Sequence, residues 1–449
     1  MILKGMVAAV AALLLLPSIG AAASPRAAPA AVPTDPVLYT TRAGDNLYTL
    51  ARRYFTRIED YVRVQRLNHV SDPYRLPVGR VLRIPRALLR FEPLTATVIA
   101  HRGPVAIRSG GQVRAVKAGS TVREGDQIVT ANNAFVSLRL PDSSVVSLPS
   151  QSQVGVRRLR RILLTGGIER LFALERGRAR AIVTPAANDD DSFRVSTPVA
   201  VSAVRGTEFR ARYDEEAARA ATEVLEGRVS VAVEGAEQKA LTVAAGFGTV
   251  ATASGTADAI ALLPSPALQR PGRVQDESEL AFEVTPLRDA AAYRVQVASD
   301  AGFLDVISEA TTPGESITLP SIPDGTWFVR TTAIGDAGIE GLPATYGFER
   351  RLQRIETALE RRRAGRYREY LFRWIVEGSG TRRYRFQLMK DRPDAAPMVD
   401  EVGLVADRFV ITDLPPGTYY WRVMSIQFAD GGAFSKWSPI ERLTISRDE

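Results

Sequence analysis

Apolar side chains recur with a helical period just after position 46 of the chain. The positions that share one face of this predicted helix are Leu47, Leu50, Ala51, Tyr54 and Phe55. Asp45 stands directly before them, after the turn residues Ala43 and Gly44. A carboxylate at this place can accept hydrogen bonds from the free amides of the first helical turn, so Asp45 is predicted to be the N-cap.

A second helix and two short strands complete this first unit. The helix is predicted at residues 59–68, and its inward-facing side chains are Tyr61, Val64 and Leu67. Short apolar runs at residues 37–41 and 80–84 are typical of strands that flank the helical pair. Residues 37–86 are therefore predicted to fold as a small β-α-α-β module.

The period changes to two over residues 94–252. The run 135–140 alternates, which places Leu138 and Leu140 on a core side and Ser137 and Arg139 outward. Further strands are predicted at 178–183, 191–196, 207–213, 223–233 and 242–250. Gly206 inside such a run indicates a bulge or a close backbone approach. Short strands at this spacing predict a central all-β domain.

A repeated pattern fills the last third of the chain. The run that begins at Tyr293 (Tyr-Arg-Val-Gln-Val) returns at Tyr384 (Tyr-Arg-Phe-Gln-Leu), and Gly325-Thr-Trp-Phe returns as Gly417-Thr-Tyr-Tyr. Two copies of one β-sandwich are therefore predicted, at 276–349 and 370–446. The four tryptophans are interpreted as core or sheet-face aromatics, with stacking on sugars as the alternative: Trp327, Trp374, Trp421 and Trp437.

Three segments between these units are predicted to be linkers. Residues 24–36 and 253–275 are rich in alanine, proline and other small residues. Residues 350–369 are rich in arginine. Their Leu352, Ile355 and Leu359 are helically spaced, so we predict a basic helical linker with a solvated face. Contact with an anionic polymer or lipid is the alternative interpretation.

The amino terminus has the layout of a secretory signal peptide. A single lysine precedes an apolar run, and small residues end the segment 1–23. Export to the periplasm, without a transmembrane anchor, is therefore expected. The chain has 449 residues, no cysteine and a net charge of +8. The positive charge would suit acidic surroundings, but expected export argues against nucleic acid as a partner.

No catalytic constellation is recognisable in the sequence. The two histidines, His69 and His101, stand apart from any serine motif, metal-ligand spacing or paired carboxylate. The acidic run at 188–191 lacks the ligand pattern of a calcium loop, so it is interpreted as a solvated turn. We therefore expect a protein that is not an enzyme and needs no metal and no other cofactor.

The first unit resembles the LysM module. The motifs that carry the resemblance are Gly44-Asp45-Asn46-Leu47, Leu67-Asn68, Asp72-Pro73 and the closing run 79–85. The resemblance implies a shallow groove between two loops that binds peptidoglycan or another polymer containing N-acetylglucosamine. The glycan-binding residues that it implies are Gly44, Asp45, Asn46, Leu47, Asp72, Pro73, Tyr74, Leu76 and Pro77. Alternatively, Gly44, Asp45 and Leu47 only build the turn, cap and core.

Two further resemblances cover the rest of the chain. The runs 117–130 and 135–148, together with Val204-Arg-Gly-Thr-Glu-Phe209, resemble the FecR domain family. That family includes regulators that carry an iron signal to a sigma factor, although this sequence has neither their cytosolic segment nor their membrane helix. The two repeats resemble fibronectin type III domains.

These observations predict a multi-domain, mainly β protein of the cell envelope. The expected function is non-catalytic binding of peptidoglycan through the LysM module, with the β domains as scaffold or partner-binding modules. A periplasmic regulatory or sensory protein that acts on an envelope partner through the FecR-like domain is the alternative. A cell-wall hydrolase is the third hypothesis, since two acidic residues distant in sequence could act together.

Overall fold

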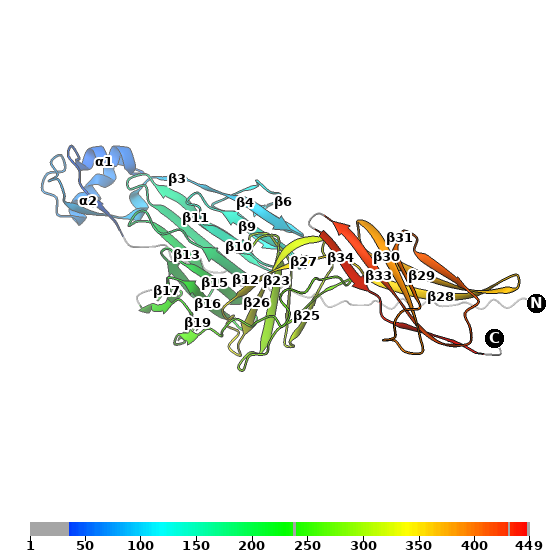
Figure 1. Cartoon of the computed structure of the whole chain (residues 1–449). Helices are drawn as coiled ribbons and strands as arrows, with labels where there is room; N and C mark the ends of the chain where they lie inside the picture. The colour runs from blue at the N-terminus through cyan, green and yellow to red at the C-terminus, as the bar shows by residue number, and fades with distance from the viewer. Residues whose placement is uncertain (1–35, 237–238, 430–431, 447–449) are drawn as a thin grey trace, which may run out of the picture.

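The computed structural model describes residues 36–236, 239–429 and 432–446. The expected signal peptide (1–23) and residues 24–35 of the first expected linker lie outside the described residues. The described chain is elongated (Figure 1). A small helical module lies at one end, a large β domain follows it, and two β-sandwiches extend toward the other end. The predicted multi-domain, mainly β architecture is confirmed.

The first module folds as predicted. Its elements are β1 (Val37–Thr40), α1 (Leu47–Tyr54), the 3-10 turn η1 (Ile58–Asp60), α2 (Tyr61–Leu67) and β2 (Val81–Ile84). Strands β1 and β2 pair antiparallel. The apolar face of α1 is buried as expected, but Leu67 is 48% exposed because α2 ends there, and Val70 after the turn enters the core instead.

The segment that connects the first module to the central domain is packed against both of them. The connection contains η2 (Arg86–Leu88), whose Leu88 is buried together with Leu89. Ile162 and Leu164 of the central domain complete the hydrophobic core of the first module. Burying these apolar side chains at the junction holds the two units together.

The central domain is one closed system of strands that form two faces. Its strands are β3 (Phe91–Pro93), β4 (Thr95–Arg102), β5 (Val105–Ser109), β6 (Gln112–Ala115), β7 (Thr121–Arg123), β8 (Gln127–Thr130), β9 (Phe135–Arg139), β10 (Val145–Leu148), β11 (Gln153–Ile162), β12 (Ile168–Ile182), β13 (Ser192–Ser196), β14 (Ala200–Val204), β15 (Glu208–Asp214), β16 (Arg219–Glu226), β17 (Arg228–Val233), β18 (Leu241–Ala244), β19 (Phe247–Thr252), β20 (Gly255–Thr256) and β21 (Ile260–Ala261). Valine, leucine and phenylalanine side chains between the faces form a single core. Neighbours pair antiparallel, with the exception of β12 and β13.

The chain passes from one face to the other at glycines. Strand β12 pairs with β11 up to Arg176 and with β15 from Gly177 onward. The predicted strands at 223–233 and 242–250 are each two strands, because the chain turns at Gly227 and Gly246, where φ is +77° and +81°. The close approach predicted for Gly206 is confirmed: a Cβ there would lie 2.9 Å from the Cα of Pro185.

Strand β9 shows why alternation underestimates burial in this chain. Leu138 faces the core as predicted, but the outward Ser137 is also buried, at 2% exposed. Its hydroxyl donates to the carbonyl of Leu304 at 2.6 Å, in the sandwich that follows. The outer side of β9 is therefore an interface between domains.

Both carboxy-terminal repeats are β-sandwiches. The first consists of β22 (Leu280–Glu283), β23 (Ala292–Ala298), β24 (Val306–Thr312), β25 (Ser316–Leu319), β26 (Gly325–Ile334) and β27 (Ala344–Arg350). The second consists of β28 (Ile355–Ala364), β29 (Tyr367–Val376), β30 (Thr381–Lys390), β31 (Val399–Leu404), β32 (Arg408–Thr412), β33 (Gly417–Ala429), β34 (Gly432–Trp437) and β35 (Glu441–Ile445). Trp374 and Trp421 are 2% exposed in the second core, as the core interpretation predicted.

Two of the predicted linkers take part in sheets. The arginine-rich segment 350–369 is not helical: β28 pairs with β29 over ten residue pairs and belongs to the second sandwich. Ile355 and Leu359 both contact its core. They are four positions apart, a spacing that places two side chains on the same side of a strand as well as on the same face of a helix. In the segment 253–275, β20 and β21 both pair with β19.

Candidate functional site

Two loops meet at the start of α1, where the sequence predicts a glycan groove. The amide of Leu47 donates to the carbonyl of Pro73 at 2.8 Å, which joins the loop 42–47 to the loop 72–77. Leu47 itself is fully buried in the core. Gly44 has a φ of +88° and open space at its Cβ position, so it builds the turn. The structure thus brings both predicted loops together.

The helix cap is Asn46 rather than Asp45. The Asn46 side chain accepts from the Thr49 amide at 2.8 Å, and the Thr49 hydroxyl faces the Asn46 backbone in return. Asp45 instead accepts from the Arg42 amide at 2.7 Å and from the Tyr39 hydroxyl at 2.8 Å. Burial and this bond to Asp45 raise the pKa of Tyr39 to about 12. The prediction that Asp45 caps the helix was wrong by one position, because its carboxylate closes the preceding turn.

The second loop keeps three of its predicted residues in structural contacts. Asp72 accepts from the Tyr74 amide at 2.9 Å. The Pro77 carbonyl accepts from the Thr41 hydroxyl at 2.5 Å, and Leu76 packs half-buried against the core. Of the predicted glycan-binding residues in this loop, Tyr74 is the aromatic one, and its side chain is 61% exposed.

Tyr74 belongs to a row of aromatic rings that the sequence did not indicate as a group. Its ring centroid lies 6.2 Å from that of Tyr48, and Tyr48 lies 6.1 Å from Tyr61. Tyr48 stands in the first turn of α1 but off its apolar face, and it is 38% exposed. An aromatic residue off the buried face, next to a proposed binding loop, was the available signal. Such rings can stack on the C–H faces of sugars.

Replacing Asn46 by alanine tests the role of the cap. The change removes the side-chain bond to the Thr49 amide, and we expect the free energy of unfolding of the first module to fall by about 1 kcal/mol. Thermal unfolding followed by circular dichroism measures this. An Asp45→Ala variant separates the two positions, because it removes the contacts with Arg42 and Tyr39 while leaving the cap intact.

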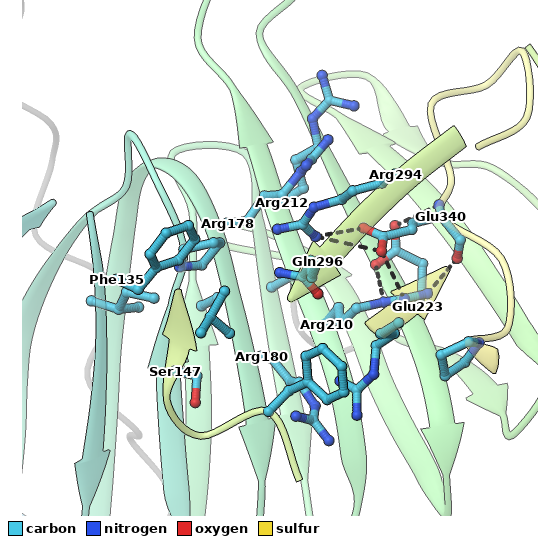
Figure 2. A pocket seen from close by; sticks show the side chains of 18 of the residues that line it. Phe135, Ser147, Arg178, Arg180, Arg210, Arg212, Glu223, Arg294, Gln296 and Glu340 are labelled. Atoms are coloured by element: carbon cyan, nitrogen blue, oxygen red, sulfur yellow. Dashed lines mark hydrogen bonds and ion pairs between the residues drawn. The ribbon is translucent and has the colours of Figure 1, made fainter. Parts of the chain in front are cut away.

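A second candidate site lies between the central domain and the first sandwich (Figure 2). It is a small cavity of about 60 Å³, into which Arg178, Arg210 and Arg294 project with Glu223 and Glu340. It adjoins a wider, mostly polar cleft of about 650 Å³, also lined by Arg178. A cavity of the smaller size holds only a few water molecules.

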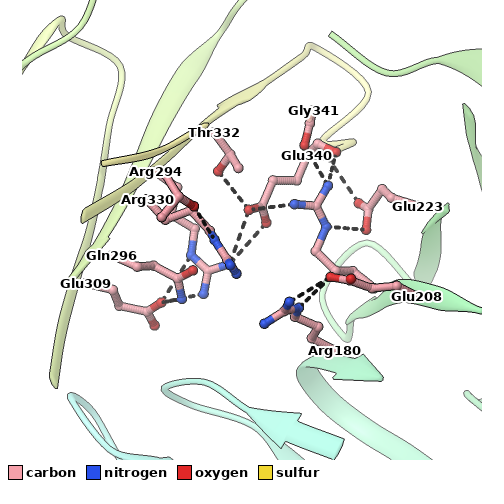
Figure 3. A network of polar contacts seen from close by, with 12 residues as sticks. Arg180, Glu208, Glu223, Arg294, Gln296, Glu309, Arg330, Thr332, Glu340 and Gly341 are labelled. Atoms are coloured by element: carbon pink, nitrogen blue, oxygen red, sulfur yellow. Dashed lines mark hydrogen bonds and ion pairs between the residues drawn. The ribbon is translucent and has the colours of Figure 1, made fainter. Parts of the chain in front are cut away.

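A buried polar network centred on Glu340 closes this cavity (Figure 3). The Glu340 carboxylate lies 3.1 Å from the guanidinium groups of both Arg210 and Arg294, and it accepts from the Thr332 hydroxyl at 2.8 Å. Arg210 comes from the central domain and Glu340 from the loop between β26 and β27. Burial alone would raise the pKa of Glu340, but the nearby arginine charges outweigh it and hold the pKa well below its usual range.

Other contacts extend the same interface. The Arg102 guanidinium donates two hydrogen bonds, of 3.1 and 3.0 Å, to the Asp305 carboxylate. Phe303 packs with Phe135, and the Arg330 guanidinium lies 3.9 Å from the centre of the Phe303 ring. Burial and the neighbouring Arg180 lower the pKa of Arg330 to about 9. The interface therefore combines an apolar contact with paired charges.

The acidic run at 188–191 serves as a structural turn. Asp191 accepts from the amides of Ala187 and Asn188, and its other oxygen accepts from the Ile168 amide at 2.8 Å. Asp189 is solvated as predicted, whereas Asp190 is largely buried near Arg86. Within the described residues, no cluster of three or more histidine or acidic side chains could hold a metal ion. No helix in the described ranges is both long and apolar enough to cross a membrane.

Two regions of the chain match known protein families. A sequence model of the LysM domain matches residues 39–85, and a model described as FecR protein matches residues 126–257. A search of curated proteins found no match.

Among solved structures, one similar chain is a candidate anti-sigma factor from Parabacteroides distasonis, with 19% identity and a TM-score of 0.24 over 30% of this chain and 57% of that one. This chain therefore spans little more than half of that protein. Two fibronectin type III domains of chicken tenascin align at 14% identity and a TM-score of 0.21, over 39% of this chain and 99% of that one. Fibronectin(III)-like modules of Clostridium thermocellum CbhA align at 11% identity and a TM-score of 0.20, over 40% of this chain and 94% of that one. Residues 39–85 thus match the LysM domain and residues 126–257 match the FecR protein family, and two β-sandwiches follow them in the chain.

Proposed function

We propose that this protein is a non-catalytic component of the cell envelope that binds peptidoglycan through its LysM domain. The observation that carries the proposal is the junction of the two loops of the LysM match beside α1, where Tyr74 and Tyr48 remain exposed. We propose that the glycan groove lies at this junction. Exposed aromatic faces beside backbone polar groups suit a sugar, which offers both C–H faces and hydroxyls. The glycan-contacting role of the remaining loop residues is part of this proposal.

The rest of the chain would hold this groove at a fixed place relative to the β domains. The LysM core is completed by Ile162 and Leu164, and Arg86 reaches Glu169 at 2.7 Å. A single groove with a small contact area gives weak affinity, micromolar or poorer. Useful retention on the wall would then come from several copies acting on one polymer.

Changing Tyr74 to alanine tests the groove. We expect retention on purified peptidoglycan to fall about tenfold, because the exposed ring can no longer stack on the sugar. The melting temperature should stay unchanged, since the side chain is 61% exposed and contributes little to the core. Co-sedimentation with insoluble peptidoglycan measures the first quantity and circular dichroism the second.

Leu38→Ala is the matched control for this experiment. Leu38 is an equally exposed apolar residue of the same domain, at 59%, but it lies on β1 rather than on the loops. Its replacement should leave retention intact. Equal retention of the Tyr74 variant and the wild type, or an equal loss in both variants, would contradict a groove centred on Tyr74.

A regulatory role is the second candidate, and the FecR match at residues 126–257 favours it. In this hypothesis the central domain binds the periplasmic part of an envelope partner. Crosslinking in cells followed by mass spectrometry tests it. A reproducible envelope partner whose crosslinks fall on the central domain supports the hypothesis, and crosslinks confined to the LysM domain count against it.

A further inference from the structure

The arginine-rich segment forms the tip of a projecting hairpin. Strands β28 and β29 run antiparallel and join through Gly365 and Arg366. Figure 1 shows this hairpin at the end of the molecule opposite α1 and α2. Every residue from 361 to 367 is exposed. A helix would distribute these arginines around its axis, whereas the hairpin gathers them at one point.

The tip carries an excess of positive charge. Residues 361–368 contain five arginines and no acidic residue. Arg362 pairs with Glu360, but no ion pair is formed by Arg363, Arg366 or Arg368 within the described residues. Arg363 and Arg368 are direct cross-strand partners. Like charges opposite one another destabilise a sheet, so this arrangement costs stability in the isolated protein.

The base of the hairpin is firmly held. Tyr370, Phe372 and Trp374 of β29 are buried in the core of the second sandwich. At the tip, by contrast, Tyr367 is 43% exposed, and the Arg366 guanidinium lies 4.8 Å from the centre of its ring. The sandwich therefore presents a projecting, cationic point that carries one amphipathic aromatic ring.

We propose that the β28–β29 tip docks on an anionic membrane surface through the phosphate groups of its lipids. Guanidinium groups bind phosphate oxygens through paired hydrogen bonds, and several of them at one point match a dense layer of phosphates. The exposed tyrosine suits the boundary between headgroups and acyl chains. A projecting tip fits an extended flat surface better than a single polymer strand, which would need a groove.

Vesicle co-sedimentation of the full chain, without any glycan, tests the proposal. The wild type should bind vesicles that contain phosphatidylcholine and about one-third phosphatidylglycerol, because the attraction is electrostatic. It should not bind vesicles of pure phosphatidylcholine. Replacing Arg362, Arg363 and Arg366 together by serine should weaken binding about 100-fold, since each arginine near an anionic surface contributes a factor of about five. Replacing the same three by lysine should preserve most of the binding.

The control removes the same charge elsewhere. Arg108, Arg288 and Arg408 are exposed arginines from the three large β domains, and their joint replacement by serine should leave vesicle binding within about twofold of the wild type. An equal loss in this variant would show that net charge, not the tip, drives binding, and would overturn the proposal. Binding to DNA or heparin without binding to anionic vesicles would also overturn it. Because no glycan is present, the outcome is independent of the LysM groove.

Discussion

Replacing Glu340 by alanine is expected to lower the free energy of unfolding by about 3–5 kcal/mol. The change removes the carboxylate that the buried guanidinium groups of Arg210 and Arg294 share at the interface. Glu223, at 3.6 Å, then remains the partner of Arg210, and Glu309 remains the partner of Arg294. Removing one member of a buried ion network is costly, because the charges that remain stay desolvated and lose part of their compensation. Urea unfolding monitored by tryptophan fluorescence and by circular dichroism measures the loss, and it shows whether the two domains still unfold together.

A surface pair provides the matched control for this variant. Glu283 pairs with Arg270 at 3.0 Å, and both side chains are well exposed, so Glu283→Ala should cost less than about 1 kcal/mol. Similar losses for the two variants would mean that the Glu340 network does not hold the interface.

The same network predicts how stability depends on pH. The folded-state pKa of Glu340 lies below its usual value of 4.5, because the arginine charges outweigh the effect of burial. Its contribution to stability is therefore complete above pH 4.5 and declines only as the pH falls below that value. The Glu340→Ala variant should lack this part of the acid dependence.

Replacing Gly177 by alanine is the second change with a large expected effect. Gly177 has a φ of +82°, and a Cβ there would lie 2.5 Å from the Gln151 carbonyl oxygen and 2.7 Å from the Ser152 Cα. Both neighbours belong to the backbone, so relief of the clash requires β12 to shift where it changes faces. We expect the free energy of unfolding to fall by about 3 kcal/mol or more, because alanine is strained in the left-handed conformation and because the strands are displaced.

Gly166 separates the two contributions. Its φ is +80°, but its Cβ position is open, so Gly166→Ala should cost only about 1 kcal/mol. Chemical unfolding of both variants gives the comparison. If Gly177→Ala lowered the free energy of unfolding no more than Gly166→Ala does, the close backbone approach at Gly177 would not constrain the domain.

The first module was predictable because its signals are local. The helical spacing of Leu47, Leu50 and Phe55 and the Gly44 turn determine the β-α-α-β order without reference to distant residues. The capping residue was missed by one position, since Asp45 and Asn46 are both good caps. The contacts of Asp45 with the Arg42 amide and the Tyr39 hydroxyl distinguish them.

Features that depend on contacts between domains could not be read from the sequence. Ser137 looks like a solvent-facing position on an alternating strand, yet Leu304 lies over it. Glu340 sits in a turn that contains Gly338 and Gly341, and nothing nearby in the sequence indicates its two arginine partners. The arginine segment was predicted to be helical because Ile355 and Leu359, four positions apart, lie on one side of either a helix or a strand. The pairing of β28 with β29, which the local sequence does not show, decides in favour of the strand.

The way in which successive domains are joined has a mechanical consequence. Lys436 of the last sandwich reaches Asp276 and Glu277 of the one before it, and Gln353 donates to Gln427 across the same junction. Side chains thus bridge each junction between successive domains in the described residues, and we expect these contacts to restrict rotation of one domain against the next. Ligands bound at the two ends of the molecule would then be held apart by the folded domains between them.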